Sequence, residues 1–160
     1  MRRVLRRLGE LAAASAGRRL LLCEALVALS AASIAIGVLP FRTVTATAQR
    51  IAPGPAPSRA KRQAACARVR WSVSVWARCL PWRPLCFPQG LAAQWMLRRR
   101  RIPSVLYYGA APHAVKAIAA HVWVCDGDVA VVGGEAARGL AVLARFPAGE
   151  PARPASDLKR

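Results

Sequence analysis

The chain has 160 residues, of which 55% are hydrophobic, and its formal net charge is +18. This length suits one domain of ordinary size plus an appendage, and the apolar content excludes a globally disordered chain. The charge favours an acidic partner, such as nucleic acid, anionic lipid or an acidic peptide, without choosing among them.

Residues 1–50 are predicted to form a helical extension. A basic amphipathic helix is expected over residues 1–16, and a nearly all-apolar helix over residues 18–38. The uncharged run at 25–39 is shorter than the roughly 20 residues that a membrane-spanning helix needs. We therefore expect the apolar run to be a buried or docking helix, with peripheral membrane contact through residues 1–40 and a signal peptide as the alternatives.

A proline-rich stretch at residues 51–58 predicts a linker. Helices are expected after it over residues 59–79 and 86–101. Pro88 fits the first turn of the second of these helices, where a missing N–H group costs nothing. We interpret the arginines at 98–101 as a solvated helix end that complements the helix dipole.

The second half of the chain predicts a small antiparallel sheet. Its strands are expected over residues 104–108, 119–125, 129–132 and 140–146. Asp126 and Gly127 form a hairpin turn signal between the second and third strands. Residues 59–147 are thus predicted to be one α+β domain, helices first and sheet second, followed by a flexible tail at 148–160.

The cysteine pattern limits the classes of site. The chain has five cysteines, an odd number, and none of them forms a CxxC pair. This excludes the usual disulfide frameworks and zinc ribbons, and no metal site is expected. A reducing cytoplasm is the simpler location for such a chain, and one of the thiols is then a candidate for reactivity.

Cys86 is the candidate nucleophile. It stands at the predicted start of a helix, where unpaired N–H groups and the helix dipole favour the thiolate. A thiol nucleophile also needs a base. Of the two histidines, His113 lies in a proline-flanked loop, whereas His121 lies on a predicted strand just before the hairpin. His121 is therefore the candidate base.

A third group should orient the imidazole of His121. Across the hairpin, the residues that face His121 fall near positions 132–134, where no carboxylate stands. Glu135 is the nearest acid and is the favoured candidate. Asp128 is the second candidate, and Asp126, in the same turn, stays open as a third.

Four segments, in this order, resemble a known family: CFPQGLAAQWMLRRR at 86–100, IP at 102–103, YYG at 107–109 and AHVWV at 120–124. Together they are similar to the C-terminal domain of the microcin-processing protein McjB. This is the leader-peptidase family of lasso-peptide gene clusters. The similarity covers about residues 66–147.

The resemblance implies a papain- or transglutaminase-like fold and a cysteine endopeptidase. Its members remove the leader from a ribosomally made precursor through an acyl-enzyme, with a Cys-His-Asp triad. Cys86 and His121 match the first two positions of the triad. The family's aspartate is expected roughly at 133–135, where this sequence has Gly133, Gly134 and Glu135.

The resemblance also implies partners. These are the leader peptide of the precursor, a small leader-recognition protein and the macrolactam cyclase. Members are described as needing ATP, but the chain has no GxxxxGK[ST] phosphate loop, and the thiol chemistry itself requires no cofactor.

Two other classes of function compete with a peptidase. The missing carboxylate opposite His121 favours a noncatalytic scaffold that binds peptide, or holds a maturation complex, on the same fold. A basic protein that binds membrane or nucleic acid ranks last, because aromatic and basic residues do not alternate in the manner of nucleic-acid-binding surfaces. No nucleic-acid partner is expected.

Overall fold

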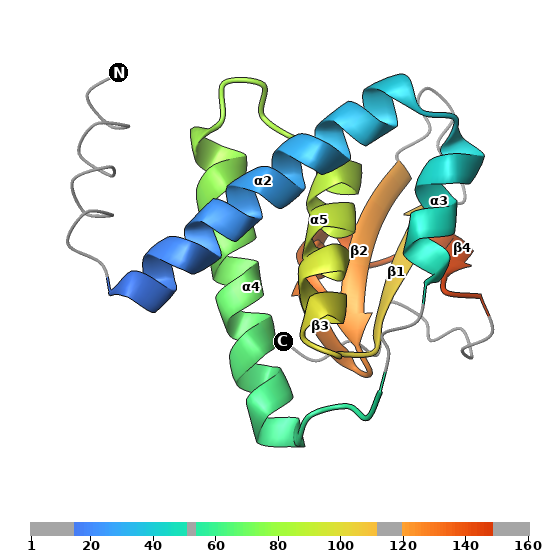
Figure 1. Ribbon diagram of the computed structural model, residues 1–160. Coiled ribbons are helices and arrows are strands. Elements are labelled where there is room, and N and C mark those ends of the chain that lie inside the picture. Colours follow the sequence, from blue (N-terminus) through green and yellow to red (C-terminus); the bar gives the residue numbers. More distant parts are fainter. Residues whose placement is uncertain (1–14, 51–53, 112–119, 149–160) are drawn as a thin grey trace.

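The computed structural model describes residues 15–50, 54–111 and 120–148, and in these ranges helices precede a sheet (Figure 1). The elements are α2 (Ala16–Val38), α3 (Phe41–Gln49), α4 (Arg59–Cys79), α5 (Cys86–Arg99), β1 (Ser104–Ala110), β2 (Ala120–Asp126), β3 (Val129–Val132), the 3-10 helix η1 (Gly134–Ala137) and β4 (Ala141–Phe146). This confirms the predicted α+β fold. The amphipathic helix expected at 1–16, the first part of the linker and nearly all of the tail lie outside the described residues.

The predicted helices and strands agree closely with the observed ones, but two short elements were not predicted. These are α3 and η1. The sequence of α3, FRTVTATAQ, is rich in β-branched residues, which lowers its intrinsic helix propensity. Tertiary contacts hold it instead, because Val44 and Ala48 are buried and Trp95 Nε1 lies 3.3 Å from Thr47 Oγ1.

The sheet is antiparallel, with the strand order β3-β2-β1-β4. One of its faces packs against α5, and Val122 and Val124 of β2 belong to this main core. The two layers meet at Gly90, where a Cβ atom would lie 2.7 Å from Val122 Cγ1. Only glycine therefore lets α5 approach β2 this closely.

The opposite face of the sheet has a smaller core. Tyr107 and Trp123 stack there with ring centroids 5.5 Å apart, and Cys125 and Ala137 are buried beside them. Side chains alternate between the faces along a strand. Positions 123 and 125 of β2 therefore share the face that lies away from α5.

The helical extension is part of the same core. Leu21, Ala25 and Leu29 of α2 are buried in the main hydrophobic cluster with residues of α4 and α5. Trp76 of α4 donates its Nε1–H to the Leu22 carbonyl at 2.8 Å. Residues 15–50 thus pack directly on the domain that was predicted to begin at residue 59.

The arginine run at the end of α5 is not simply a solvated helix end. Arg98 donates to the carbonyl oxygens of Thr47 and Ala48 at the end of α3, and burial lowers its pKa to about 10. Arg100 lies 2.5 Å from Glu24 of α2, and its hydrogen bond lowers the pKa of that carboxyl. These two arginines join α3 and α2 to α5, and the prediction that they are solvated was wrong.

Candidate active site

Cys86 is the first residue of α5 and is half-buried against the main core. The backbone N–H of Gln89 donates to the Leu85 carbonyl at 3.3 Å, and its side-chain amide donates to the Pro84 carbonyl at 2.6 Å. The N–H groups of Cys86 and Phe87 precede that first helical bond. Such free N–H groups and the helix dipole favour a thiolate at this position.

The other cysteines occupy less suitable places. Burial, with a smaller contribution from Asp126, raises the pKa of Cys66 to about 11 and that of Cys125 to about 12. Cys23 lies on the exposed side of α2, and Cys79 is the last residue of α4. Cys86 alone among the five begins a helix, in agreement with the choice made from the sequence.

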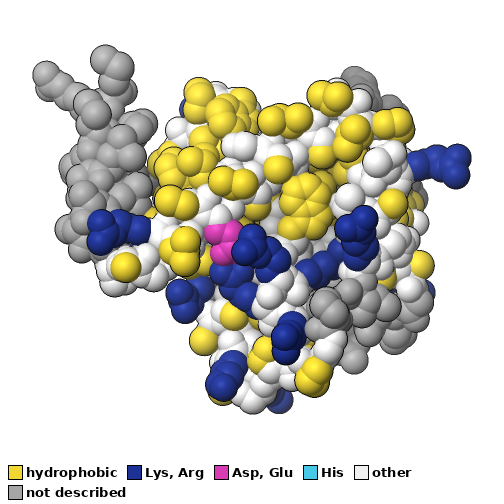
Figure 2. Space-filling model, viewed as in Figure 1, with side chains coloured by type: hydrophobic (Ala, Val, Ile, Leu, Met, Phe, Trp, Pro, Cys, Tyr) yellow, Lys and Arg dark blue, Asp and Glu magenta, His cyan; other side chains and the backbone are white. Residues whose placement is uncertain are grey.

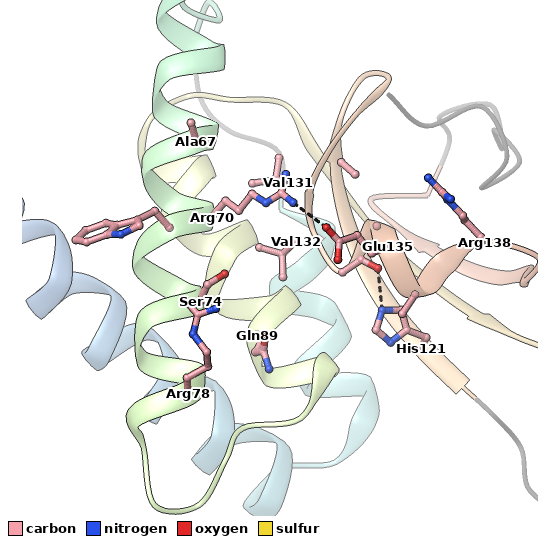
Figure 3. A pocket seen from close by; sticks show the side chains of 15 residues that line it. Ala67, Arg70, Ser74, Arg78, Gln89, His121, Val131, Val132, Glu135 and Arg138 are labelled. Atoms are coloured by element: carbon pink, nitrogen blue, oxygen red, sulfur yellow. Dashed lines mark hydrogen bonds and ion pairs between the residues drawn. The ribbon is translucent and has the colours of Figure 1, made fainter. Parts of the chain in front are cut away.

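His121 is the second residue of β2 and lines a cavity of about 610 Å³. Figure 3 shows the imidazole facing residues from α4, α5 and η1 across this space. These residues include Arg70, Ser74 and Arg78 of α4, Gln89 of α5 and Glu135 of η1. Nε2 of His121 lies 2.9 Å from the carbonyl oxygen of Gly133, and because a carbonyl only accepts, this nitrogen donates its N–H.

The structure brings His121 and Glu135 to one cavity but does not join His121 to Cys86. The imidazole lines the same cavity as Gln89 of α5, but Cys86 is not among the described residues that line it. Within the described ranges no hydrogen bond links the sulfur to the ring. Gln89, three residues after Cys86, reaches the cavity in its place. The catalytic roles of Cys86 and His121 stay predictions.

The third group of the site is a backbone carbonyl in this structure. Glu135 is 81% exposed, and its carboxylate lies 3.4 Å from Arg70 Nη2 (Figure 3). Gly133 has a φ of 79°, which glycine adopts readily, and this turn directs its carbonyl to the ring. Gly133 lies within positions 132–134, where the sequence predicted residues facing His121, but the sequence could not show that a main-chain atom would be the partner.

The two aspartates offered as alternatives lie at the far end of β2 from His121, Asp126 as its last residue and Asp128 in the turn that follows. Asp126 is buried, and its Oδ2 atom lies 3.0 Å from Arg62 Nε and 3.9 Å from Cys66 Sγ. Burial raises the pKa of Asp126, and the attraction of Arg62 only partly offsets this. Asp128 follows in the turn between β2 and β3. The structure therefore does not bring either carboxylate to His121.

The cavity has a cationic lining. Arg70, Arg78 and Arg138 contribute three guanidinium groups, and Glu135 is the acidic residue among the described lining residues. Because arginine binds carboxylates in a fixed, often bidentate geometry, this surface suits a peptide segment that bears acidic groups. Sequence analysis missed these residues because they come from α4 and from the segment after β3, which meet only in the fold.

Comparisons with known proteins identify the family of the chain. No curated protein and no solved structure matches the chain. A family model described as the transglutaminase-like superfamily matches residues 25–145, from α2 to β4. This range covers most of the chain and includes both Cys86 and His121. The chain therefore belongs to the transglutaminase-like superfamily.

Proposed function

We propose that this protein is a cysteine endopeptidase that removes the leader from a ribosomally made lasso-peptide precursor. The observation that carries the proposal is the place of Cys86, at the free N-terminus of the helix that packs on the sheet of a transglutaminase-like domain. This superfamily includes cysteine peptidases. The substrate class rests on the resemblance of the segments around Cys86 and His121 to lasso-peptide leader peptidases.

In the proposed reaction the thiolate of Cys86 attacks the carbonyl carbon at the junction of leader and core. His121 takes the thiol proton of Cys86 as the thiolate forms, the N–H groups of Cys86 and Phe87 face the developing oxyanion, and His121 then gives this proton to the leaving amine. Water then attacks the acyl-enzyme, His121 accepts the proton of that water, and the thiol is regenerated. No cofactor takes part in these bond changes, and the proposal gives ATP no role in them.

The geometry sets one condition on this reaction. His121 Nε2 donates to Gly133 O, so the ring has to exchange this carbonyl for the sulfur of Cys86 when peptide binds. Catalytic hydrogen bonds commonly tighten only in the substrate complex. Glu135, beside Gly133, is the proposed third group for the ring in its new position.

The direct test follows leader release by mass spectrometry. The full chain is incubated with the precursor and the leader-recognition protein, and the Cys86→Ala variant is compared with Cys23→Ala. We expect release by the wild type and by Cys23→Ala and none by Cys86→Ala. Cleavage that is unchanged in Cys86→Ala would sink the assignment.

A second candidate function is a noncatalytic scaffold that binds the precursor, or holds a maturation complex, on the same fold. The observation that favours it is the contact of His121 with a carbonyl and not with a thiol or a carboxylate. The pH profile of Cys86 alkylation separates the two candidates. Pairing with His121 makes Cys86 reactive below pH 7 and makes that reactivity depend on His121, whereas a scaffold keeps the profile of an ordinary thiol. Tight binding of intact precursor without turnover would also support the scaffold.

The proposed context is the cytoplasm, where free thiols persist. The proposed partners are the leader peptide, the small leader-recognition protein and the macrolactam cyclase that acts on the released core. Arg70, Arg78 and Arg138 of the cavity are the proposed contacts for acidic groups of the leader.

A further inference from the structure

The outward side of α2 carries an unbroken apolar stripe. Its members are all exposed: Leu20, Cys23, Val27, Ala31, Ile34 and Val38, which we call the α2 stripe. The exposed fraction is 72% for Leu20, 66% for Val27 and 65% for Ile34. At 1.5 Å per residue the stripe is about 27 Å long. Exposed apolar surfaces of this extent mark sites of protein or membrane interaction.

The opposite side of α2 is fixed to the domain. Leu21, Ala25, Leu29 and Ala32 are at most 4% exposed, within the core shared with α4 and α5. Among the described residues α2 is the one helix long and apolar enough to cross a membrane. If α2 crossed a membrane, these buried residues would have to leave the core. Only the stripe is therefore available for contact with a membrane.

The surroundings of the stripe are cationic. Between residues 11 and 125 the only acidic residue is Glu24, and its carboxylate already lies 2.5 Å from Arg100 and 3.7 Å from Arg99. Arg19 and Arg42 are exposed near the two ends of α2. Figure 2 shows hydrophobic side chains along α2 with Lys and Arg side chains across the face below them.

We propose that the α2 stripe docks this protein on the surface of an anionic bilayer, with α2 lying in the plane of the membrane. An exposed apolar strip flanked by arginines binds bilayers in this way, by apolar burial and attraction to anionic headgroups. The cationic surroundings favour an anionic partner. The stripe itself is uncharged over its whole length, so it offers no pattern of charges to a specific acidic protein. Together these two features favour an anionic lipid surface.

This docking goes beyond the proposed peptidase activity and does not depend on it. Among the described residues no member of the stripe lines the cavity of His121. That cavity lies between α4, β3 and η1, so it stays open when α2 rests on lipid. The docked protein would process its peptide at the membrane surface.

Vesicle flotation tests the docking with the full chain. Vesicles of phosphatidylcholine alone are compared with vesicles that contain 30% phosphatidylglycerol, at about 150 mM salt. We expect co-flotation with the anionic vesicles, and at least tenfold weaker binding of the Val27→Glu/Ile34→Glu variant. The matched control is Leu143→Glu on β4, whose side chain is 61% exposed in the wild type and should leave binding unchanged.

The same assay defines what would overturn the proposal. Binding that survives Val27→Glu/Ile34→Glu would show attraction through arginines alone, and no binding to either vesicle would leave the stripe to a protein partner. Protein retained after alkaline carbonate extraction would show that α2 spans the bilayer. An environment-sensitive dye on Cys23, in a Cys79→Ala/Cys86→Ala background, gives a second readout. Its emission should shift to the blue with anionic vesicles, and an unchanged spectrum would contradict contact of the stripe with lipid.

Discussion

The two ends of β2 differ in the burial and the partners of their polar side chains. At one end Asp126 is 6% exposed and is held by Arg62 of α4, with Cys66 beside it. At the other end His121 is half-exposed, contacts only the carbonyl of Gly133 among the described residues, and lines an open cavity. The same strand thus carries one polar group locked into the structure and another left accessible to a ligand. The lesson is that burial and partners, and not residue type, separate structural from functional polar groups.

The largest expected effect lies at the open end. His121→Ala should reduce leader release about a thousandfold, because a positioned general base contributes a factor of this size. Its free energy of unfolding should change little, since the ring is half-exposed. Quantitative mass spectrometry and thermal melting measure the two quantities. Loss of the folded state together with activity would show that this end of β2 is structural too.

The next effect concerns thiol accessibility. At pH 8 a thiol with the pKa of Cys66, about 11, has roughly a thousandth of its population as thiolate. Iodoacetamide should therefore modify Cys66 at least about a hundredfold more slowly than the exposed Cys23, as read by peptide mass spectrometry. Cys125 should be as slow, because its pKa is about 12. Rapid labelling of either would mean that the Asp126 end of β2 opens.

The buried ion pair gives a smaller, thermodynamic effect. Arg62→Met leaves the carboxylate of Asp126 without its partner and should lower the free energy of unfolding by about 2 kcal/mol. This figure lies below the range for fully buried pairs because the Arg62 side chain is 28% exposed. Urea unfolding measures it, with the exposed Arg68→Met on the same helix as the control.

The destabilisation by Arg62→Met should depend on pH. Burial raises the folded-state pKa of Asp126 above its ordinary value, so the protonated form is favoured on folding. As the pH falls through that raised pKa toward 3.8, the carboxyl takes up a proton and the uncompensated charge disappears. The penalty of Arg62→Met should therefore shrink between pH 7 and pH 4. A penalty that grows in acid would contradict the assigned direction.

The smallest effect is expected at Glu135. With 81% of the side chain exposed and a 3.4 Å contact to Arg70, Glu135→Gln should leave stability unchanged. Because this exposed carboxylate is the proposed third group for His121 once the ring has left Gly133 O, leader release should fall only about threefold in kcat, with KM unchanged. An unchanged kcat would leave the orienting role to Gly133 O.

The sequence predicted the fold well because its signals are local. Apolar periodicity and proline positions placed α2, α4 and α5, and the Asp126-Gly127 turn fixed the hairpin of β2 and β3. The helix α3 was not predicted because it is held by Arg98 and Trp95, which are distant in sequence. No local pattern can report such contacts.

The candidate site was predictable only in part. A cysteine before a helix and a histidine on a strand are visible in the sequence, and both occupy the predicted elements. The hydrogen bond of the His121 ring with Gly133 O, and the cavity that the ring shares with α4 and α5, depend on how distant segments pack. The close approach of Gly90 to Val122 and Val124 is one such pairing.

The glycine at the contact of α5 and β2 has a bearing on how such a protein can change over time. A single methyl group at position 90 would meet Val122 at 2.7 Å and would lift the helix off the strand. The sulfur of Cys86, one turn earlier, would move with it. A substitution at position 90 would thus change the position of the Cys86 sulfur relative to the sheet, although Gly90 has no functional group. Selection for catalysis should therefore preserve this glycine as strongly as the cysteine.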